Sequence, residues 1–147
     1  MTYKIKEITD LNAVSVDHLV EESEQEGYRF LTRLVKQYAD GSELFQKPGE
    51  ALFGVWKEDE LVGIGGILQN SYSDDPSSGR LRRFYVLAEE RRHGVGTLLL
   101  EACLNKAKES FKSVTCRTDS AKADAFYRQN GFVAVHHSPD TTHRITF

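Results

Sequence analysis

Two glycines in the run Arg91-Arg92-His93-Gly94-Val95-Gly96-Thr97 have the spacing of an anion-binding turn. The run follows a strand-like apolar segment, Leu81 to Leu87, and precedes a leucine-rich helical pattern that starts near Leu98. Glycines let the main chain bend tightly and bring successive N–H groups close to an anion. The helix start adds unpaired N–H donors and a partial positive charge. The run therefore predicts a phosphate-binding turn, although Gly-x-Gly also occurs in turns that only redirect the chain.

The same turn argues against two common classes of phosphate ligand. It lacks the third glycine of a dinucleotide-binding fingerprint and the Gly-Lys-Ser/Thr ending of a nucleotide P-loop. We therefore expect the phosphate to belong to another class of ligand.

Length and composition predict one globular domain over residues 1–147. The chain is 39% hydrophobic and 28% charged, which suffices for one continuous core. Its formal net charge of −3 gives no broad basic surface, so nucleic-acid binding is not expected. The first residues are charged where a signal peptide is apolar, and no run reaches membrane-spanning length. We therefore expect a soluble, cytoplasmic protein without a membrane partner.

The cysteines and histidines do not have the spacing of a metal site. Cys103 and Cys116 lack metal-ligand spacing, and we interpret both as packing residues of a protein from a reducing compartment. His136 and His137 are adjacent, so on a strand their side chains point to opposite faces. We expect no metal cofactor.

Hydrophobic periodicity predicts a mixed sheet covered by helices. Helical patterns occupy 14–39 with a break at Gly27, a segment from about 98 to 111, and 121–130 with a left-handed cap at Gly131. Strand-like runs occupy 3–8, 51–57, 61–69, 80–87, 113–118, 132–137 and 142–147. The runs at 51–57 and 61–69 form a hairpin, and Gly65-Gly66 indicates a bulge or a close approach of the main chain.

Three segments, taken together, resemble the GNAT superfamily of acyl-CoA-dependent N-acyltransferases. They are Arg82-Arg83-Phe84-Tyr85-Val86-Leu87, then Arg91-x-x-Gly94-x-Gly96, and further on Ala123-x-x-Phe126-Tyr127-x-x-Asn130-Gly131-Phe132. The resemblance covers essentially the whole chain in element order. It implies an α/β (α+β) single-domain fold of order β-α-α-β-β-β-α-β-α-β-β. The seven-stranded sheet would be mixed and mostly antiparallel, with helices on both faces, and the resemblance also implies a homodimer.

The resemblance further implies a cleft for acetyl-CoA between the fourth and fifth strands. In the family these strands splay apart, and the pantetheine arm would pair here with main-chain groups of Tyr85, Val86 and Leu87. The pyrophosphate would be wrapped by N–H groups of Arg92, His93, Gly94, Val95 and Gly96. Thr97 would offer a hydroxyl, and Arg91 matches the leading Arg or Gln of the motif. Ser120 stands where many members carry an Asn that contacts the cofactor, and its side chain reaches less far.

Acyl transfer from a thioester to an amine needs a proton for the departing thiolate and a donor for the oxyanion. Tyr127 is our predicted general acid, because a phenol with a pKa near 10 is protonated at neutral pH and can hydrogen-bond to the sulfur. Its alternative role is that of a core aromatic on the short helix. The resemblance implies that the main-chain N–H of Val86, freed by a strand bulge, meets the oxyanion.

The general base stays open, because the fourth strand offers Arg82 and Arg83 rather than a carboxylate. Side chains that are open alternatives are Asp119, His136, His137 and Tyr72. A chain of waters that drains the proton to solvent is an equal alternative.

The family builds its acceptor site from the first helices, the loop before the fourth strand and the last hairpin. The side chains that this implies here are Tyr28, Arg29, Phe30, Arg33 and Tyr72, with Asp74 and Asp75 in the same loop. The acidic run Glu21, Glu22, Glu24 and Glu26 attracts a cationic amine or is a solvated helix face, and it does not identify the acceptor.

Two functions from different classes follow. The first is direct transfer of an acetyl or acyl group from acetyl-CoA to a primary amine of a small molecule or peptide within a ternary complex. A covalent route through either cysteine is disfavoured, because neither lies in a motif typical of an activated thiol. The alternative is a non-catalytic acyl-CoA-binding regulatory module on the same fold. A transcription or adaptor domain is not favoured, because the chain has no basic recognition helix.

Overall fold

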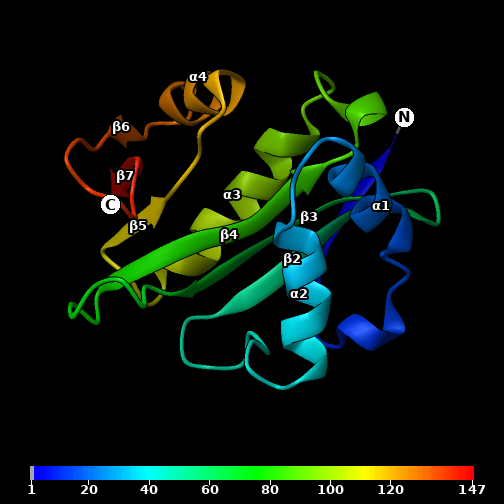
Figure 1. Cartoon of the computed structure of the whole chain (residues 1–147), viewed down its shortest axis with the longest axis horizontal. Helices are drawn as coiled ribbons and strands as arrows, with labels where there is room; N and C mark the ends of the chain where they lie inside the picture. Colours follow the sequence, from blue (N-terminus) through cyan, green and yellow to red (C-terminus); the bar gives the residue numbers. More distant parts are fainter. Residues whose placement is uncertain (1) are drawn as a thin grey trace.

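A computed structural model of the chain describes residues 2–147 and contains a seven-stranded sheet in the order β1-β2-β3-β4-β5-β7-β6 (Figure 1). The strands are β1 (Tyr3–Glu7), β2 (Ala51–Lys57), β3 (Glu60–Gln69), β4 (Ser78–Val86), β5 (Ser113–Cys116), β6 (Val133–Ala134) and β7 (His143–Thr146). The helices are α1 (Asp17–Gln25), α2 (Phe30–Ala39), α3 (Val95–Lys108) and α4 (Ala121–Gln129), with 3-10 turns at Leu11–Ala13 and Ala88–Glu90. Neighbouring strands are antiparallel except β4 and β5, which are parallel. The predicted element order and the mostly antiparallel sheet are confirmed.

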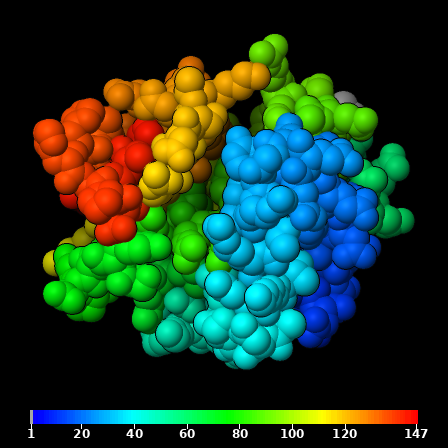
Figure 2. Space-filling model, in the orientation of Figure 1, coloured from blue at the N-terminus to red at the C-terminus, as the bar shows by residue number. Residues whose placement is uncertain are grey.

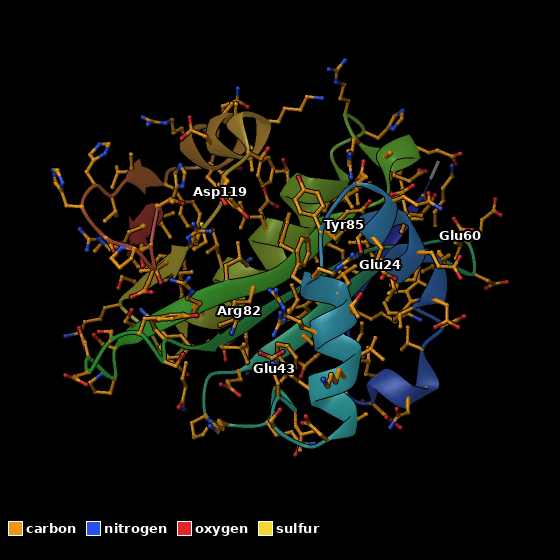
Figure 3. The ribbon with its side chains drawn as sticks, in the orientation of Figure 1. Glu24, Glu43, Glu60, Arg82, Tyr85 and Asp119 are labelled. Atoms are coloured by element: carbon orange, nitrogen blue, oxygen red, sulfur yellow. The ribbon has the colours of Figure 1, made fainter. Side chains whose placement is uncertain are left out.

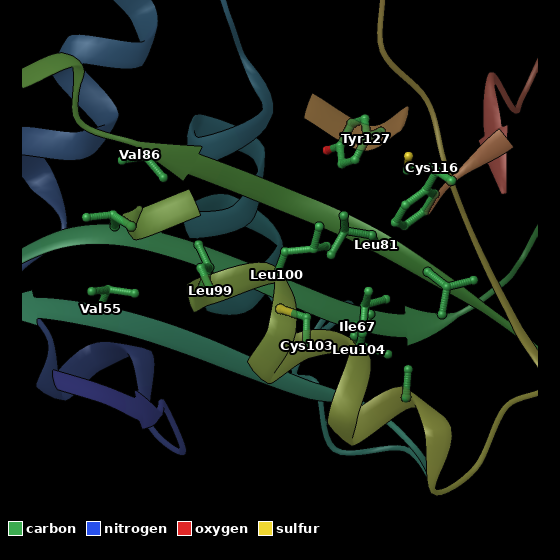
Figure 4. Close-up of a cluster of buried hydrophobic side chains, with 14 of the residues drawn as sticks. Val55, Ile67, Leu81, Val86, Leu99, Leu100, Cys103, Leu104, Cys116 and Tyr127 are labelled. Atoms are coloured by element: carbon green, nitrogen blue, oxygen red, sulfur yellow. The ribbon is translucent and has the colours of Figure 1, made fainter. Parts of the chain in front are cut away.

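Helices cover both faces of the sheet, as predicted. On one face, α3 packs an apolar stripe that includes Leu99, Leu100 and Cys103 against β2, β3 and β4 (Figure 4). On the other face, α1 and α2 bury Leu19, Leu31 and Leu34 in a second core with residues of β2 and β3. Burying a side chain of this size contributes roughly 1.5–3 kcal/mol. The two cores therefore hold β4, which runs through the middle of the sheet, from both sides.

Within residues 2–147, no helix is both long and apolar enough to cross a membrane.

Several boundaries differ from the predicted ones for local reasons. Helix α3 begins at Val95 rather than near Leu98, because Gly94, with φ 82°, turns the chain directly into the helix. Strand β4 begins at Ser78 rather than 80, because Ser78 pairs with Ser113 of β5. The strand predicted at 132–137 shortens to β6, and His137 adopts φ 65° beyond it.

The predicted irregularity at Gly65-Gly66 is confirmed, and the extra residue lies in β4. Ile64 pairs with Tyr85 and Gly66 with Arg82, so Gly65 alone faces both Arg83 and Phe84. Arg83 adopts φ 60°, the left-handed region that side chains other than glycine rarely occupy. In a regular strand Arg82 and Arg83 would point to opposite faces. The bulge instead directs both side chains toward Glu43.

The sheet opens between β4 and β5. The two strands pair only over Ser78, Gly79 and Arg80 of β4, and β5 then pairs with β7. The part of β4 from Leu81 to Val86 therefore lacks a strand neighbour on that side. In the space-filling view a hollow separates the α1–α2 part of the molecule from the part formed by β5, α4 and β6 (Figure 2).

Candidate functional site

The hollow along β4 is a cleft of about 1320 Å³. Its lining includes consecutive residues of β4 from Arg80 to Val86, the glycine turn before α3, the start of α4, and side chains from the α1–α2 corner. Of the residues predicted to bind the cofactor, those that line the cleft are Tyr85, Val86, Arg91, Arg92, Gly94, Gly96, Thr97, Ser120 and Tyr127. The fold thus brings together residues from the three segments of sequence that carried the prediction.

The glycine turn has the geometry expected of an anion site. The first main-chain bond of α3 runs from the N–H of Leu98 to the carbonyl of Gly94 (3.0 Å), so the N–H groups of Val95, Gly96 and Thr97 have no partner within the helix. No atom lies within 4 Å of the Cβ position at Gly94, so the turn is open. Free donors and the positive end of the helix dipole therefore meet at the mouth of the cleft.

Two residues of the predicted pyrophosphate turn do not contribute side chains to the cleft. His93 is exposed on the outer side of the turn, and Val95 is buried in the core beneath it. Only their main-chain N–H groups can serve the anion. This agrees with a site built from the backbone.

The side chain of Arg91 fastens the glycine turn to the rest of the cleft. Its Nε donates to the carbonyl of Val86 (3.0 Å), and its guanidinium binds both carboxylate oxygens of Glu26 (3.0 and 2.6 Å). The hydrogen bond from Arg91 lowers the pKa of Glu26 below its ordinary value. Arg91 therefore positions the turn and leaves anion binding to the N–H groups.

Tyr85 joins the same network from β4. Its hydroxyl lies 2.6 Å from Glu22 and 2.5 Å from Glu26, and Glu22 also accepts from the N–H of Ala88 (3.0 Å). Burial and the two carboxylates raise the pKa of Tyr85 well above 10. Two members of the predicted acidic run, Glu22 and Glu26, are therefore engaged with Tyr85, Ala88 and Arg91 at the protein's own surface, and these two are not free to attract a cationic amine.

Main-chain groups of β4 face the cleft only at alternate residues. The N–H of Leu87 donates to Val62 of β3 (2.9 Å) and its carbonyl accepts from Glu90, so Leu87 has no group left for a ligand in the cleft, and we leave it out of the proposed site. Because the direction of the N–H groups alternates along a strand and that of Leu87 points to β3, the N–H of the preceding residue, Val86, points away from β3. The bulge that was expected to free it lies at Arg83 and Phe84, earlier in the strand.

Tyr127 is both a core aromatic and a residue of the cleft wall. It is 7% exposed, and its ring packs against Phe126, Phe132 and His143 at centroid distances of 5.2–5.6 Å. Burial raises the pKa of Tyr127, with smaller contributions from the thiols of Cys116 and Cys103. The core-aromatic role of Tyr127 is therefore observed, and its place in the cleft wall is the position that the predicted acid role requires.

Ser120 has a structural task at the start of α4. Its hydroxyl accepts the N–H of Ala123 (3.2 Å), which makes it the N-cap of the helix. The hydroxyl proton stays available to a ligand in the cleft.

Of the side chains considered as a general base, only Tyr72 lines the cleft. Asp119 is 80% exposed and pairs with Arg117 (3.2 Å), on the segment between β5 and α4 (Figure 3). His136 and His137 are exposed beyond β6. Among residues 2–147, Glu26 is the one carboxylate in the lining, and it is paired with Arg91.

Neither cysteine is an activated nucleophile. Cys103 is fully buried in the α3 core, and burial raises its pKa. Cys116 lies at the cleft wall, where burial raises its pKa to about 12. Both thiols are protonated at neutral pH. Residues 2–147 contain no group of three side chains suited to hold a metal ion.

Four of the five predicted acceptor residues line the cleft, namely Tyr28, Phe30, Arg33 and Tyr72. Arg29 does not; it pairs with Glu24 on the surface (3.4 Å). Arg80 lines the same part of the cleft and was not predicted to have a role, and Arg82 was predicted as part of the motif but not as a binding residue. Three arginines within four residues of a central strand were the signal that could have identified them.

Fold and cleft together define an α/β protein whose sheet opens between two parallel strands at an anion-binding turn. The model of the acetyltransferase (GNAT) family matches residues 14–132, and the chain belongs to this family. A sequence comparison with curated proteins returns no match.

Solved structures agree with the assignment to this family. A protein from Exiguobacterium sp. 255-15, proposed to be an acetyltransferase, is 30% identical and superposes with a TM-score of 0.90 over 99% of this chain and 94% of its own. An acetyltransferase from Streptococcus agalactiae 2603 is 18% identical, with a TM-score of 0.77 over 99% and 98% of the two chains. A protein from Bacillus anthracis str. Ames, proposed to be a streptothricin acetyltransferase, was solved in complex with acetyl coenzyme A. It is 19% identical, with a TM-score of 0.59 over 69% and 65%.

Proposed function

We propose that the protein transfers an acetyl group from acetyl-CoA to an amine by direct attack within a ternary complex. The observation that carries this proposal is the open Gly94 turn at the mouth of the splayed β4–β5 cleft, with Tyr127 in the cleft wall. The acetyl coenzyme A held by the structural neighbour from Bacillus anthracis supports the choice of donor.

In the proposed reaction the pyrophosphate of acetyl-CoA binds the N–H groups that open α3, and the acyl arm lies along β4. A neutral amine attacks the thioester carbonyl, so that a C–N bond forms and the C–S bond breaks. The N–H of Val86 is the proposed donor to the oxyanion, and Tyr127 protonates the departing thiolate. The pKa of Tyr127, raised by burial, keeps this proton in place at neutral pH. The proton that the amine loses leaves through the open cleft to solvent, and Tyr127 takes a proton back from solvent, so that the reaction releases CoA as the thiol.

Titration calorimetry with acetyl-CoA, followed by a thiol-release screen over amino acids, polyamines and peptide N-termini, tests the proposal. We expect binding of acetyl-CoA and release of CoA with at least one class of amine. Binding without release on any acceptor would favour the non-catalytic module, for which the missing carboxylate on β4 is the supporting observation. Failure to bind any acyl-CoA would contradict both functions.

A further inference from the structure

An arginine cluster, here Arg33, Arg80 and Arg82, occupies the end of the cleft that lies away from the glycine turn. Arg80 and Arg82 are on the first part of β4, whereas the turn follows the last part of that strand. Arg33 comes from α2, and its charge acts on Arg82 across the cleft. Because of the bulge, Arg82 pairs with Gly66 and Val86 with Gly63, which lie three steps apart along β3, and this corresponds to about 10 Å. The cluster and the anion-binding turn are therefore two separate sites of positive charge.

Arg82 has no carboxylate of its own. Its guanidinium lies 3.8 Å from Glu43 (Figure 3), but that carboxylate already accepts two hydrogen bonds from Arg83, at 2.9 and 3.2 Å. Arg83 is further held by Gln37 and by the carbonyl of Phe30. One carboxylate thus faces two guanidinium groups. The charge of Arg82, which is 32% exposed in the cleft, is left uncompensated.

Arg80 is buried with only neutral partners. It is 5% exposed, and its guanidinium donates to the carbonyl of Asp140 and to the hydroxyls of Thr141 and Thr115. Its Nε has no hydrogen-bond partner among residues 2–147. Burying a charge without a counter-ion is costly, and such groups are expected where a ligand supplies the opposite charge. The guanidinium carbon of Arg80 lies 4.5 Å from the centre of the Tyr72 ring. One face of that ring therefore contacts Arg80, and the other face is left for a ligand.

General basicity of the protein does not explain the cluster, because the net charge of the chain is −3. The phosphates of acetyl-CoA do not explain it either, since the glycine turn has its own donors together with the cleft residues Arg92 and Lys122. The one carboxylate in the lining among residues 2–147, Glu26, is paired with Arg91 at the other end. The carboxylates of Glu43 and Asp140 offset only part of the charge of Arg33, Arg80, Arg82 and Arg83, so this end of the cleft keeps a net positive potential.

We propose that the acceptor is an amine that also carries an anionic oxygen group, a carboxylate or a phosphate, and that Arg82 binds this group. Arg33 and Arg80 add positive potential, and the rings of Tyr28, Phe30 and Tyr72 contact the rest of the acceptor. This inference rests on the proposed function and names the substrate class for it. The anionic group takes no part in bond making; it fixes the amine in front of the thioester.

Matched acceptors test the inference. Phenylalanine is compared with phenylalanine amide, and phosphoethanolamine with ethanolamine, by thiol release at saturating acetyl-CoA; putrescine serves as a cationic amine. We expect at least one anionic member to exceed its neutral partner at least tenfold in kcat/KM, and the two pairs distinguish a carboxylate from a phosphate. R82Q should remove most of this preference through KM, R33Q should reduce it, and R82K should retain part of it. The Kd of acetyl-CoA should stay within twofold in all three variants.

K4Q removes one positive charge from exposed edge strand β1 and should leave the preference unchanged. Equal rates on both members of both pairs, or an equal loss on both in R82Q, would overturn the inference while leaving the acetyltransferase intact. Titration of N-acetylphenylalanine and its amide in the presence of CoA gives a second readout without turnover. The same titration is made with N-acetylphosphoethanolamine and N-acetylethanolamine. Equal affinity within both pairs would also overturn the inference, whereas failure to bind acetyl-CoA would contradict the proposed function instead.

Discussion

The ring of Tyr127 is held by its neighbours where the residue lines the cleft. Phe126, Phe132 and His143 surround the ring, and His143 is itself fixed by Asp124 (2.7 Å) and Thr142 (2.8 Å). A side chain so constrained keeps its position at the cleft wall through the reaction. The same packing that makes Tyr127 a core residue therefore prepares it for proton donation.

Y127F should retain the packing and lose the proton. We expect kcat to fall by about 100-fold, the lower end of what general acid catalysis contributes, while the Kd of acetyl-CoA changes by less than twofold. Steady-state thiol release and calorimetry measure the two quantities. Y3F removes a phenol of β1 and should leave kcat unchanged. An unaffected kcat in Y127F would return Tyr127 to a purely structural role.

Elements, rather than single side chains, create the anion site, since it depends on where α3 begins. Gly94 and Gly41 make a matched pair, because both have φ 82° and neither has an atom within 4 Å of its Cβ position. G94A and G41A should each cost roughly 1 kcal/mol of stability from left-handed strain. Only G94A should weaken acetyl-CoA binding, by about tenfold, because its methyl group lies where the pyrophosphate approaches. Equal affinities in the two variants would place the pyrophosphate elsewhere.

The bulge in β4 is the element that gives the cleft its second charged end. R83A leaves Glu43 buried without its main partner, and breaking a buried pair costs about 3–5 kcal/mol. R83G should cost about 1 kcal/mol less than R83A, because φ 60° suits glycine. Urea unfolding of the two variants measures the difference. A larger loss in R83G would contradict the assignment of strain to this residue.

Local signals in the sequence predicted the elements and failed at the bulge. Gly27 and Gly131 mark helix ends as predicted, with φ 91° and 94°. The irregularity opposite Gly65 was also indicated. What could not be predicted is that the extra residue is Arg83, because a left-handed conformation is unfavourable for arginine and is stabilised here by partners distant in sequence, namely Glu43, Gln37 and the carbonyl of Phe30. The proposed role of Arg82 depends on that pairing and was not predicted, although Tyr28, Phe30, Arg33 and Tyr72 were predicted for the acceptor and line the same cleft.

At the scale of the whole molecule, positive charge gathers inside the cleft of a protein whose net charge is −3. Negative side chains elsewhere on the surface do not cancel this local field, because exposed charges more than about 8–10 Å apart are screened at physiological salt. Under the proposals made above, the cleft draws in an anionic donor at one end and an anionic acceptor at the other. Both substrates are then steered to the same opening in the sheet.

The free energy of unfolding should be highest over an intermediate range of pH and should fall on the acid and the alkaline sides for different reasons. On the acid side, hydrogen bonds and ion pairs lower the folded-state pKa values of Glu26, Asp40, Asp75 and Asp124. Their contribution is present above the ordinary values near 4 and is lost as the pH falls through the lowered ones. On the alkaline side, burial raises the pKa values of Cys103 and Cys116. Their contribution is present below the ordinary value of 9.0 and is lost as the pH rises.

The contribution of the thiols to the loss of stability at high pH can be removed without changing the loss at low pH. Above pH 9 the unfolded chain releases thiol protons that the folded chain keeps, so each cysteine should lower the free energy of unfolding by about 1.4 kcal/mol per pH unit. The double variant C103A/C116A should be less stable at pH 7, because it leaves small cavities, yet it should lose less stability between pH 9 and 10 than the parent protein, the remaining loss coming from tyrosines such as Tyr85 and Tyr127 with raised pKa values. Urea unfolding from pH 3 to 11 under reducing conditions measures both losses. E26Q is the converse control, because it should reduce the loss of stability at low pH only. A slope between pH 9 and 10 that is as steep in the double variant as in the parent protein would assign the alkaline loss to groups other than the thiols.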